Sequence, residues 1–296
     1  MTPTSSGAAG TSATSDPAAN DPSVAPPRAA GPSLAVAIID TDLHQLARQA
    51  LLHSMQSMER QGLPFSQVLI YSDKPELWPG LPVIRIPTLR SISEYNLLVT
   101  RELARHLSAD FVLVIQYDGF VLNADQFSPH FLHYDYIGAP WPNYDRHEVG
   151  NGGFSWRSRR LVQAVAQLDY DDPTEAEDLF ICRRMRETLE RQGCRFAPKA
   201  IAQHFSVEFP AVPFPTFGFH GIFHLPSVYR ESPDFLVEHL SDRIIKSRSN
   251  YLLPGLQVVS PAAAQRLQQR LAALQAADAV AAAATAATSA ATPPQA

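Results

Sequence analysis

The sequence predicts a single α/β domain built around a mainly parallel sheet. Four short apolar runs are typical of buried strands, and helical patterns lie between most of them. Three of the four runs end in a polar cluster, and in an open α/β sheet that edge is where ligands bind. The predicted strands span residues 34–39, 67–71, 83–87 and 111–115.

Helix signals follow the strands in order. Asp42 is a predicted N-cap for a first helix, and Ser91 with Glu94 fits a capping box that opens a second one, with an apolar stripe through Leu107. After Asp118 the segments become shorter, more aromatic and richer in Gly and Pro. Further helices are predicted at about residues 159–168, from 172 to about 191, from 232, and from 260 to about 276.

Both ends of the 296-residue chain are poor in residues that can form a core. Residues 1–32 are mostly Ala, Pro, Ser, Thr, Gly and Asp, and residues 279–296 are nearly all Ala and Thr before Pro-Pro-Gln-Ala. Because such segments cannot offset the entropy of ordering, we predict two disordered tails. Residues 33–278 remain, enough for one large domain.

The composition argues against several classes of protein. A net charge of −5 argues against nonspecific nucleic-acid binding. The N-terminus lacks a basic start and an apolar segment, and no stretch approaches the ~18 apolar residues of a membrane span. Cys182 and Cys194 make no disulfide framework and are expected to be free core thiols. We therefore expect a soluble cytoplasmic protein.

Polar groups lie just past the carboxyl end of the fourth predicted strand, in Gln116-Tyr117-Asp118-Gly119. Gln116 and Asp118 are two residues apart, so in extended chain their side chains leave on the same face. Two oxygen-bearing side chains converging there can hold a hard cation, a sugar hydroxyl, or both. The alternative is an ordinary strand followed by an Asp-Gly turn.

The glycine cluster Gly150-Asn151-Gly152-Gly153 does not have the pattern of a phosphate loop. Glycine lets a backbone pass close to a ligand, so the amides of Gly152 and Gly153, or the Asn151 side chain, can bind a sugar. A tight turn is the alternative. Trp141 belongs to a nearby aromatic stretch that can stack on sugar or base faces, with core packing as the alternative.

Three more residues are candidates for chemistry. Glu177 and Asp178 lie in the first turn of a predicted helix, where each is either a general base for an acceptor hydroxyl or an acid favoured by the helix N-terminus. His220 lies between glycines and is either a structural group or a neutral imidazole that completes a metal site with Asp118. Glu208 is expected to be structural.

Five segments taken in this order resemble one family. They are Gln-Tyr-Asp-Gly after a strand, Tyr-Ile-Gly-Ala-Pro-Trp, Gly-Asn-Gly-Gly-Phe-Ser-Trp-Arg-Ser, Glu-Asp-Leu-Phe-Ile-Cys and Phe-Gly-Phe-His-Gly. The set resembles the bacterial and fungal family known as domain of unknown function 5672, which is similar in turn to glycosyltransferases of the GT-A fold. The resemblance covers about residues 34–225.

The resemblance implies a GT-A-like (Rossmann-like) αβα sandwich with a nucleotide-sugar site. In such enzymes a D-x-D motif holds a divalent metal and the donor diphosphate, and here Gln116-Tyr117-Asp118 occupies that place, with an amide replacing the first carboxylate. By the same resemblance, Asp118 and His220 hold Mn²⁺ or Mg²⁺. Asp178 or Glu177 supplies the base.

The expected function is metal-assisted transfer of a sugar from a nucleotide sugar to the hydroxyl of a glycan or other acceptor. One alternative is a catalytically inactive nucleotide-sugar or glycan-binding module, which the Gln116 departure favours. Another is a metal-dependent hydrolase that uses the same acids on water. The candidate donor- or substrate-binding residues are Gln116, Asp118, Asn151, Gly152, Gly153 and Trp141.

Overall fold

The computed structural model describes residues 31–209 and 214–290. The described residues from Pro32 onward belong to one compact unit. The tail predicted at residues 1–32 lies outside the described residues up to residue 30, as does the end of the second tail from residue 291. The domain limits 33–278 therefore stay a prediction.

The central sheet has six strands in the order β3-β2-β1-β4-β6-β5. Their bounds are β1 Leu34–Ile39, β2 Gln67–Ser72, β3 Val83–Arg85, β4 Phe111–Ile115, β5 Tyr136–Ile137 and β6 Ser155–Ser158. Strands β1 to β4 are parallel, whereas β6 is antiparallel to both of its neighbours. The four predicted strands and the mainly parallel α/β architecture are confirmed. Strands β5 and β6 were not predicted, nor was a small parallel pair, β7 Ser206–Val207 and β8 Gly218–Phe219.

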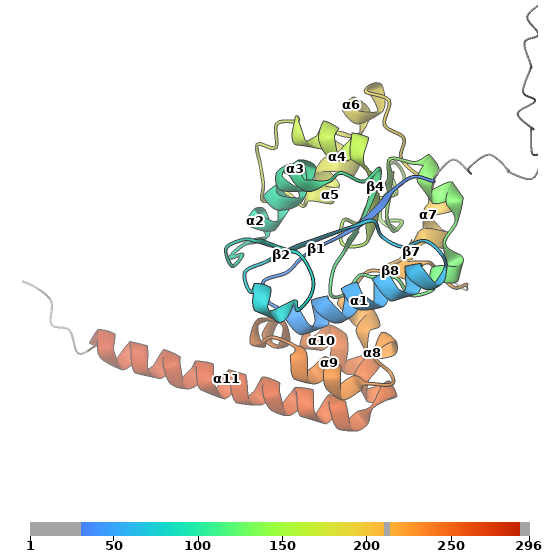
Figure 1. Cartoon of the computed structure of the whole chain (residues 1–296). Helices are drawn as coiled ribbons and strands as arrows, with labels where there is room; N and C mark the ends of the chain where they lie inside the picture. Colours follow the sequence, from blue (N-terminus) through green and yellow to red (C-terminus); the bar gives the residue numbers. More distant parts are fainter. Residues whose placement is uncertain (1–30, 210–213, 291–296) are drawn as a thin grey trace, which may run out of the picture. The chain divides into compact units, whose positions relative to one another are not determined.

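Helices cover both faces of the sheet. Figure 1 shows α1 and α8 to α11 on one side, and α2, α3 and α4 on the other. Two π-helical turns, Leu98–Glu102 and Phe180–Arg184, follow α2 and α5. The helices are α1 His44–Arg60, α2 Ile92–Leu97, α3 Leu103–His106, α4 Arg159–Ala166, α5 Glu177–Leu179, α6 Arg186–Arg191, α7 Lys199–Phe205, α8 Leu225–Val228, α9 Pro233–His239, α10 Asp242–Val259 and α11 Pro261–Ala290.

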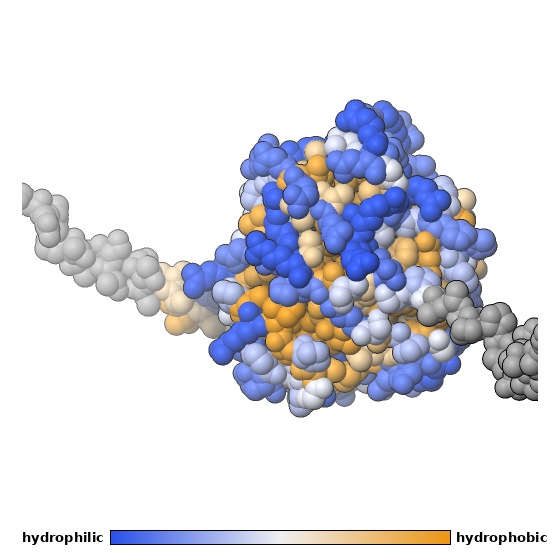
Figure 2. Space-filling model, turned by 45° about the horizontal axis from the view of Figure 1, so that its top comes forward, coloured by the Kyte–Doolittle hydropathy of each residue, from blue (hydrophilic) through white to orange (hydrophobic). Residues whose placement is uncertain are grey.

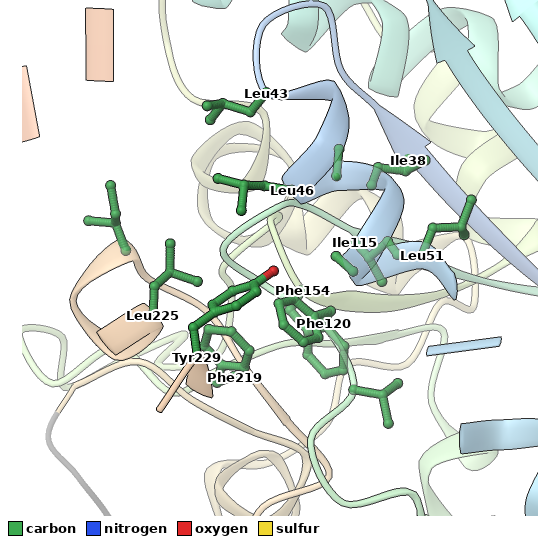
Figure 3. Close-up of a cluster of buried hydrophobic side chains, with 14 of the residues drawn as sticks. Ile38, Leu43, Leu46, Leu51, Ile115, Phe120, Phe154, Phe219, Leu225 and Tyr229 are labelled. Atoms are coloured by element: carbon green, nitrogen blue, oxygen red, sulfur yellow. The ribbon is translucent and has the colours of Figure 1, made fainter. Parts of the chain in front are cut away.

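The alternation of side chains along β1 explains the two layers. Val36 and Ile38 belong to the larger core on the α1 side, whereas Ala35 and Ala37 belong to a second core with Leu103. Every residue of β1 is buried, as expected for a parallel strand covered on both faces. Figure 3 shows the larger core, where α1 meets aromatic side chains from later segments of the chain. Cys182 and Cys194 are buried and free, as predicted.

The order of the strands creates a crevice. From β1 the chain moves outward through β2 and β3, and then returns to place β4 on the other side of β1. Ile38 of β1 pairs with both Ile70 and Ile115, so the three parallel strands end at one edge. In open α/β sheets, ligands bind beyond the carboxyl ends of the strands at such a switch point. The functional site is therefore expected between the ends of β1 and β4.

Two helix starts show how the capping predictions fared. Ser91 caps α2 as predicted, since its Oγ accepts from the backbone N–H of Glu94 at 3.3 Å. The prediction for Asp42 is wrong, because α1 begins one residue later, after Leu43. The Asp40 carboxylate takes the capping role and accepts from the N–H groups of Leu43 and Asp42 at 2.9 and 3.2 Å.

Two helices in the second half differ from expectation. The segment predicted as one helix from residue 172 begins only at Glu177 and is broken into α5, a π-helical turn and α6. The last helix, α11, continues to Ala290, whereas we expected it to end near Ala276 and a disordered tail to follow from residue 279. Alanine has the highest helix propensity, and no Gly or Pro interrupts the helix before Ala290.

Figure 2 shows an apolar area in the lower part of the face presented, below hydrophilic side chains. Six large apolar residues of the described chain are exposed: Ile92, Leu97, Phe209, Tyr251, Val258 and Val280. No helix in the described ranges combines the length and the apolar character needed to cross a membrane.

Candidate functional site

Two adjoining cavities open at the carboxyl edge of the sheet. The first has a volume of about 480 Å³ and is lined by Asp40, Thr88 and Tyr95, among others. The second, of about 460 Å³, reaches toward His220 and α10. Both cavities are lined by Ile92, Gln116, Tyr117 and Arg243. We call the two cavities together the cleft, and it lies at the switch point between β1 and β4.

The turn after β4 carries the candidate residues into the cleft. Backbone hydrogen bonds of 2.8 and 3.1 Å join Gln116 and Gly119 in both directions. Gln116 Nε2 donates to the Tyr95 hydroxyl at 2.6 Å, and Gln116 Oε1 lies 3.2 Å from His220 Nε2. Asp118 Oδ1 lies 3.9 Å from the same ring nitrogen. The fold therefore brings Gln116 and Asp118, which are neighbours in sequence, to the Nε2 atom of the distant His220.

Asp118 is buried without a full set of partners. The residue is 8% exposed, and its Oδ1 has no hydrogen-bond partner within the part of the chain that the structure describes. Burial raises the pKa of this carboxyl, and the charge of His220 opposes the shift. A buried carboxylate oxygen without a donor is costly unless a cation or a proton compensates its charge. Asp118 is thus suited to bind a cation.

The other nitrogen of the His220 ring faces Glu208 and Asn151. Nδ1 lies 3.4 Å from Glu208 Oε1 and 3.0 Å from Asn151 Nδ2. Burial lowers the pKa of His220, but the hydrogen bond to Glu208 and the charge of Asp118 outweigh it, so the pKa lies above its ordinary value. Glu208 and Asn151 thus hold the ring in an orientation in which Nε2 faces Gln116 and Asp118.

The donor atoms in the cleft suit a cation that is shared with a phosphate. Asp118 offers a carboxylate oxygen, His220 a ring nitrogen and Gln116 an amide oxygen, all of which bind divalent ions. Mg²⁺ is commonly bound by one or two carboxylates together with substrate phosphates. Within residues 31–209 and 214–290, no group of three or more His, Cys, Asp or Glu side chains is arranged to hold a metal by itself.

The glycine cluster Gly150–Gly153 packs against His220 and the neighbouring residues of the cleft. Asn151 adopts the left-handed φ of 66°, and its Oδ1 accepts from Gly153 N–H at 3.2 Å. A Cβ on Gly153 would lie 2.1 Å from His220 Nε2, and a Cβ on Gly152 would lie 1.8 Å from Glu177 Oε1. Side chains of the protein itself therefore lie next to both glycines, and the predicted close approach to a ligand stays a prediction.

Glu177 and Asp178 point to different partners. Glu177 is 4% exposed, and its Oε1 forms an ion pair with Arg157 Nη2 at 3.0 Å. Asp178 is half-buried, and its Oδ2 accepts from Gly152 N–H at 3.0 Å. The buried ion pair with Arg157 favours a supporting role for Glu177 over the predicted role of general base. Asp178 is close enough to raise the pKa of His220 and remains the candidate.

The aromatic candidates are placed differently from the polar ones. Trp141 packs its ring over Gly150 and in a T-shape on Tyr144, with ring centroids 5.5 Å apart, which favours the packing alternative. The cleft has its own apolar rim, made by three of the exposed large side chains: Ile92, Phe209 and Tyr251. These three were not predicted as site residues.

Three polar residues of the site were not predicted as site residues. Glu208 was expected to be structural, yet it contacts His220, and Tyr95 fixes the Gln116 amide. Arg157 supports the glycine cluster through Gly152 O, at 3.3 Å. Only Arg157 could have been noticed in the sequence, because it is a charged residue that directly follows the aromatic segment Phe154-Ser155-Trp156. Nothing in the local sequence marks Glu208 or Tyr95.

Several solved structures are similar to this chain. The mannosyltransferase PcManGT from Pyrobaculum calidifontis, in complex with GDP-Man and Mn²⁺, shares 15% identity with a TM-score of 0.42, over 91% of this chain and 82% of that one. A glycosyltransferase involved in the glycosylation of the major capsid of PBCV-1 shares 9% identity with a TM-score of 0.42, over 64% and 93%. Glucosyl-3-phosphoglycerate synthase from Mycobacterium tuberculosis, in complex with UDP, shares 11% identity with a TM-score of 0.40, over 72% and 82%.

No curated protein matches the sequence. A family model described as "Protein of unknown function (DUF5672)" matches residues 81–220. The match begins just before β3 and ends at His220, so it contains the Gln116–Gly119 turn, the glycine cluster and the acidic pair. Residues 81–220 of this chain are therefore similar to the family that the resemblance named.

Proposed function

We propose that the protein is a glycosyltransferase, which moves a sugar from a nucleotide sugar to an acceptor hydroxyl. The observation that carries the proposal is the buried Asp118 carboxylate, whose Oδ1 lies 3.9 Å from His220 Nε2 and has no hydrogen-bond partner among the described residues. The pair lies at the switch point of an α/β sheet, where nucleotide ligands bind. A carboxylate and an imidazole placed there suit a cation that accompanies a diphosphate.

The cleft has room for the two parts of a nucleotide-sugar donor. Cavities of about 480 and 460 Å³ fall within the usual range for small-molecule sites. We place the nucleoside in the first cavity, beside Asp40 and Thr88, and the diphosphate in the second, at Asp118 and His220. The rim residues Ile92, Phe209 and Tyr251 offer apolar surface for a sugar ring.

The proposed cation is Mn²⁺ or Mg²⁺, held by Asp118 and His220 with Gln116 as a neutral ligand. When bound, it stabilises negative charge on the diphosphate leaving group. Gln116 carries one charge less than a carboxylate, so this site is expected to hold its cation more weakly than a site with two carboxylates. Glu208 orients His220 through Nδ1.

Asp178 is the proposed base for an inverting transfer. Its carboxylate takes the proton of the acceptor hydroxyl as that oxygen attacks the anomeric carbon, and the diphosphate leaves with the electrons of the broken bond. Gly152 N–H holds the carboxylate in place through Oδ2. A retaining transfer would need no such base.

One alternative function has an observation in its favour. Gln116 is engaged on both sides, by Tyr95 and by His220, and its neutral amide weakens metal binding. Such a site can bind a nucleotide sugar without transferring it. A hydrolase that uses water in place of the acceptor would share the same residues.

The first experiment is a thermal shift of the full chain with a panel of nucleotide sugars, with and without Mn²⁺. We expect at least one donor to raise the Tm, and the Mn²⁺-dependent part of this shift to vanish in Asp118→Ala and in His220→Ala. The two effects should be non-additive, because one site is lost only once. Arg146→Ala is the matched control, because Arg146 belongs to an exposed ion pair with Glu187 and does not line the cleft.

Turnover assays separate the three functions. A transferase releases the nucleoside diphosphate only when an acceptor is present, a hydrolase releases it in water, and a binding module releases none. If the wild type binds no donor, the whole proposal is without support. If it binds a donor equally well in the presence of a chelator, only the metal part of the proposal is without support.

A further inference from the structure

We propose that Arg248 of α10 binds the diphosphate of the donor and supplies positive charge that the Gln116 site lacks. The inference rests on the proposed function, because it assigns a residue to the diphosphate part of the same cleft. Arg248 lies outside residues 81–220, so the family match does not include it. It lines the second cavity together with Asp118 and His220.

Two arginines of α10 line this cavity, and they differ in what holds them. The Arg243 guanidinium bonds to Asp42 Oδ2 through Nε and Nη2, at 3.0 and 2.7 Å. Arg248 forms no ion pair among the residues that the structure describes, and its guanidinium lies 5.8 Å from the centre of the Tyr251 ring. Arg243 is thus neutralised by Asp42, whereas Arg248 brings an uncompensated charge to the cavity.

The helix fixes the direction in which Arg248 points. Ile244, Arg248 and Tyr251 are four and three residues apart, so they share one face of α10, and all three line the cavity. Ile245 and Leu252 are fully buried and anchor the helix. Arg248 is therefore held at the wall of the cavity that Asp118 and His220 also line.

The charges in the cleft explain why a further cation is needed. Glu208 and Asp118 both carry negative charge near His220, and the phosphates of a donor add more. Gln116 contributes no charge that would strengthen the hold on a divalent ion. A guanidinium presents a planar pair of donors that matches phosphate oxygens. Arg248 can therefore neutralise the diphosphate directly, whether or not the cation is present.

The test is calorimetric binding of UDP and GDP, and of uridine and guanosine, to the wild type and to Arg248→Gln. For the nucleotide that binds, we expect Arg248→Gln to weaken diphosphate binding roughly ten- to hundredfold, because a hydrogen bond to a charged group is lost. Binding of the matching nucleoside should be unchanged. Arg248→Lys should restore part of the diphosphate affinity.

Lys246→Gln is the matched control. It removes the same charge from the same helix, but Lys246 pairs with Asp278 of α11 at 2.7 Å. We expect it to bind the diphosphate as the wild type does, with the Tm of each variant confirming its fold.

Three results would overturn the inference. Equal diphosphate affinity in Arg248→Gln and the wild type would remove Arg248 from the site and leave the proposed function standing. A parallel loss of nucleoside binding would show that the arginine does not act on phosphate. A wild type that binds none of the four ligands would overturn the proposed function, and the inference with it.

Discussion

The buried ion pair between Arg157 and Glu177 gives the sharpest test of the site's architecture. The two side chains are 2% and 5% exposed, and their contact is 3.0 Å. Arg157 Nε also donates to Ser155 Oγ at 2.9 Å, and Nη2 to Gly152 O at 3.3 Å. Glu177→Ala removes the only carboxylate that the described chain places on this guanidinium. The remaining charge is then buried without compensation.

The expected cost follows from the burial. Removing one partner of a buried pair typically destabilises a protein by about 3–5 kcal/mol. For a domain of this size each kcal/mol lowers the Tm by about 2–4 °C, so Glu177→Ala should lower it by on the order of 6–20 °C. Replacing both partners, as in Arg157→Met with Glu177→Leu, should cost less than Glu177→Ala alone, because no charge remains buried.

Urea unfolding at neutral pH measures these differences. Glu187→Ala is the control, since its pair with Arg146 is 61% and 72% exposed and should contribute no more than about 1 kcal/mol. A loss below about 1 kcal/mol in Glu177→Ala would refute the assignment. So would a Glu177→Ala variant of wild-type stability with no turnover, because that behaviour is expected of a base and not of a buried support.

Three further predictions concern other parts of the chain. Asp178→Asn should lower turnover by about 10²–10⁴ with little change in donor affinity or Tm, as measured in a steady-state transfer assay, and wild-type turnover would exclude it as the base. Burial raises the pKa of Asp40 from 3.8 to about 6, with the charge of His44 opposing, so the stabilising effect of its protonated form is lost as pH rises through this range. The free energy of unfolding of the wild type, measured in urea, should therefore fall by up to about 3 kcal/mol relative to that of Asp40→Asn between pH 4 and 7. A difference between the two proteins that does not change with pH would contradict the raised pKa of Asp40. A chain that ends at residue 278 should keep its Tm within a few degrees, because residues 279–283 are exposed, and a larger drop in a thermal melt would show that the end of α11 packs on the domain.

The four parallel strands and the position of the site edge could be predicted because they depend on local patterns. Apolar runs such as residues 34–39 and 111–115 bury both faces of a parallel strand, and the polar residues that follow must leave the sheet at its carboxyl edge. Gln116 and Asp118 were placed in the cleft by this reasoning alone. The Ser91 cap was predictable for the same reason, because its partner lies only three residues away.

The contacts that make the site depend on residues far apart in the chain. His220 meets Gln116 across 104 positions, and Glu208 and Arg248 reach the same space from segments with no local signal. Burial also distinguishes Glu177 from Asp178. The two adjacent acids at a helix start look alike in sequence, but only Glu177 pairs with the buried Arg157. Local pattern sets which face of an element is apolar, but which charges meet depends on tertiary packing. In the low-dielectric interior, that packing decides whether a carboxylate is sealed in an ion pair or left open to a ligand.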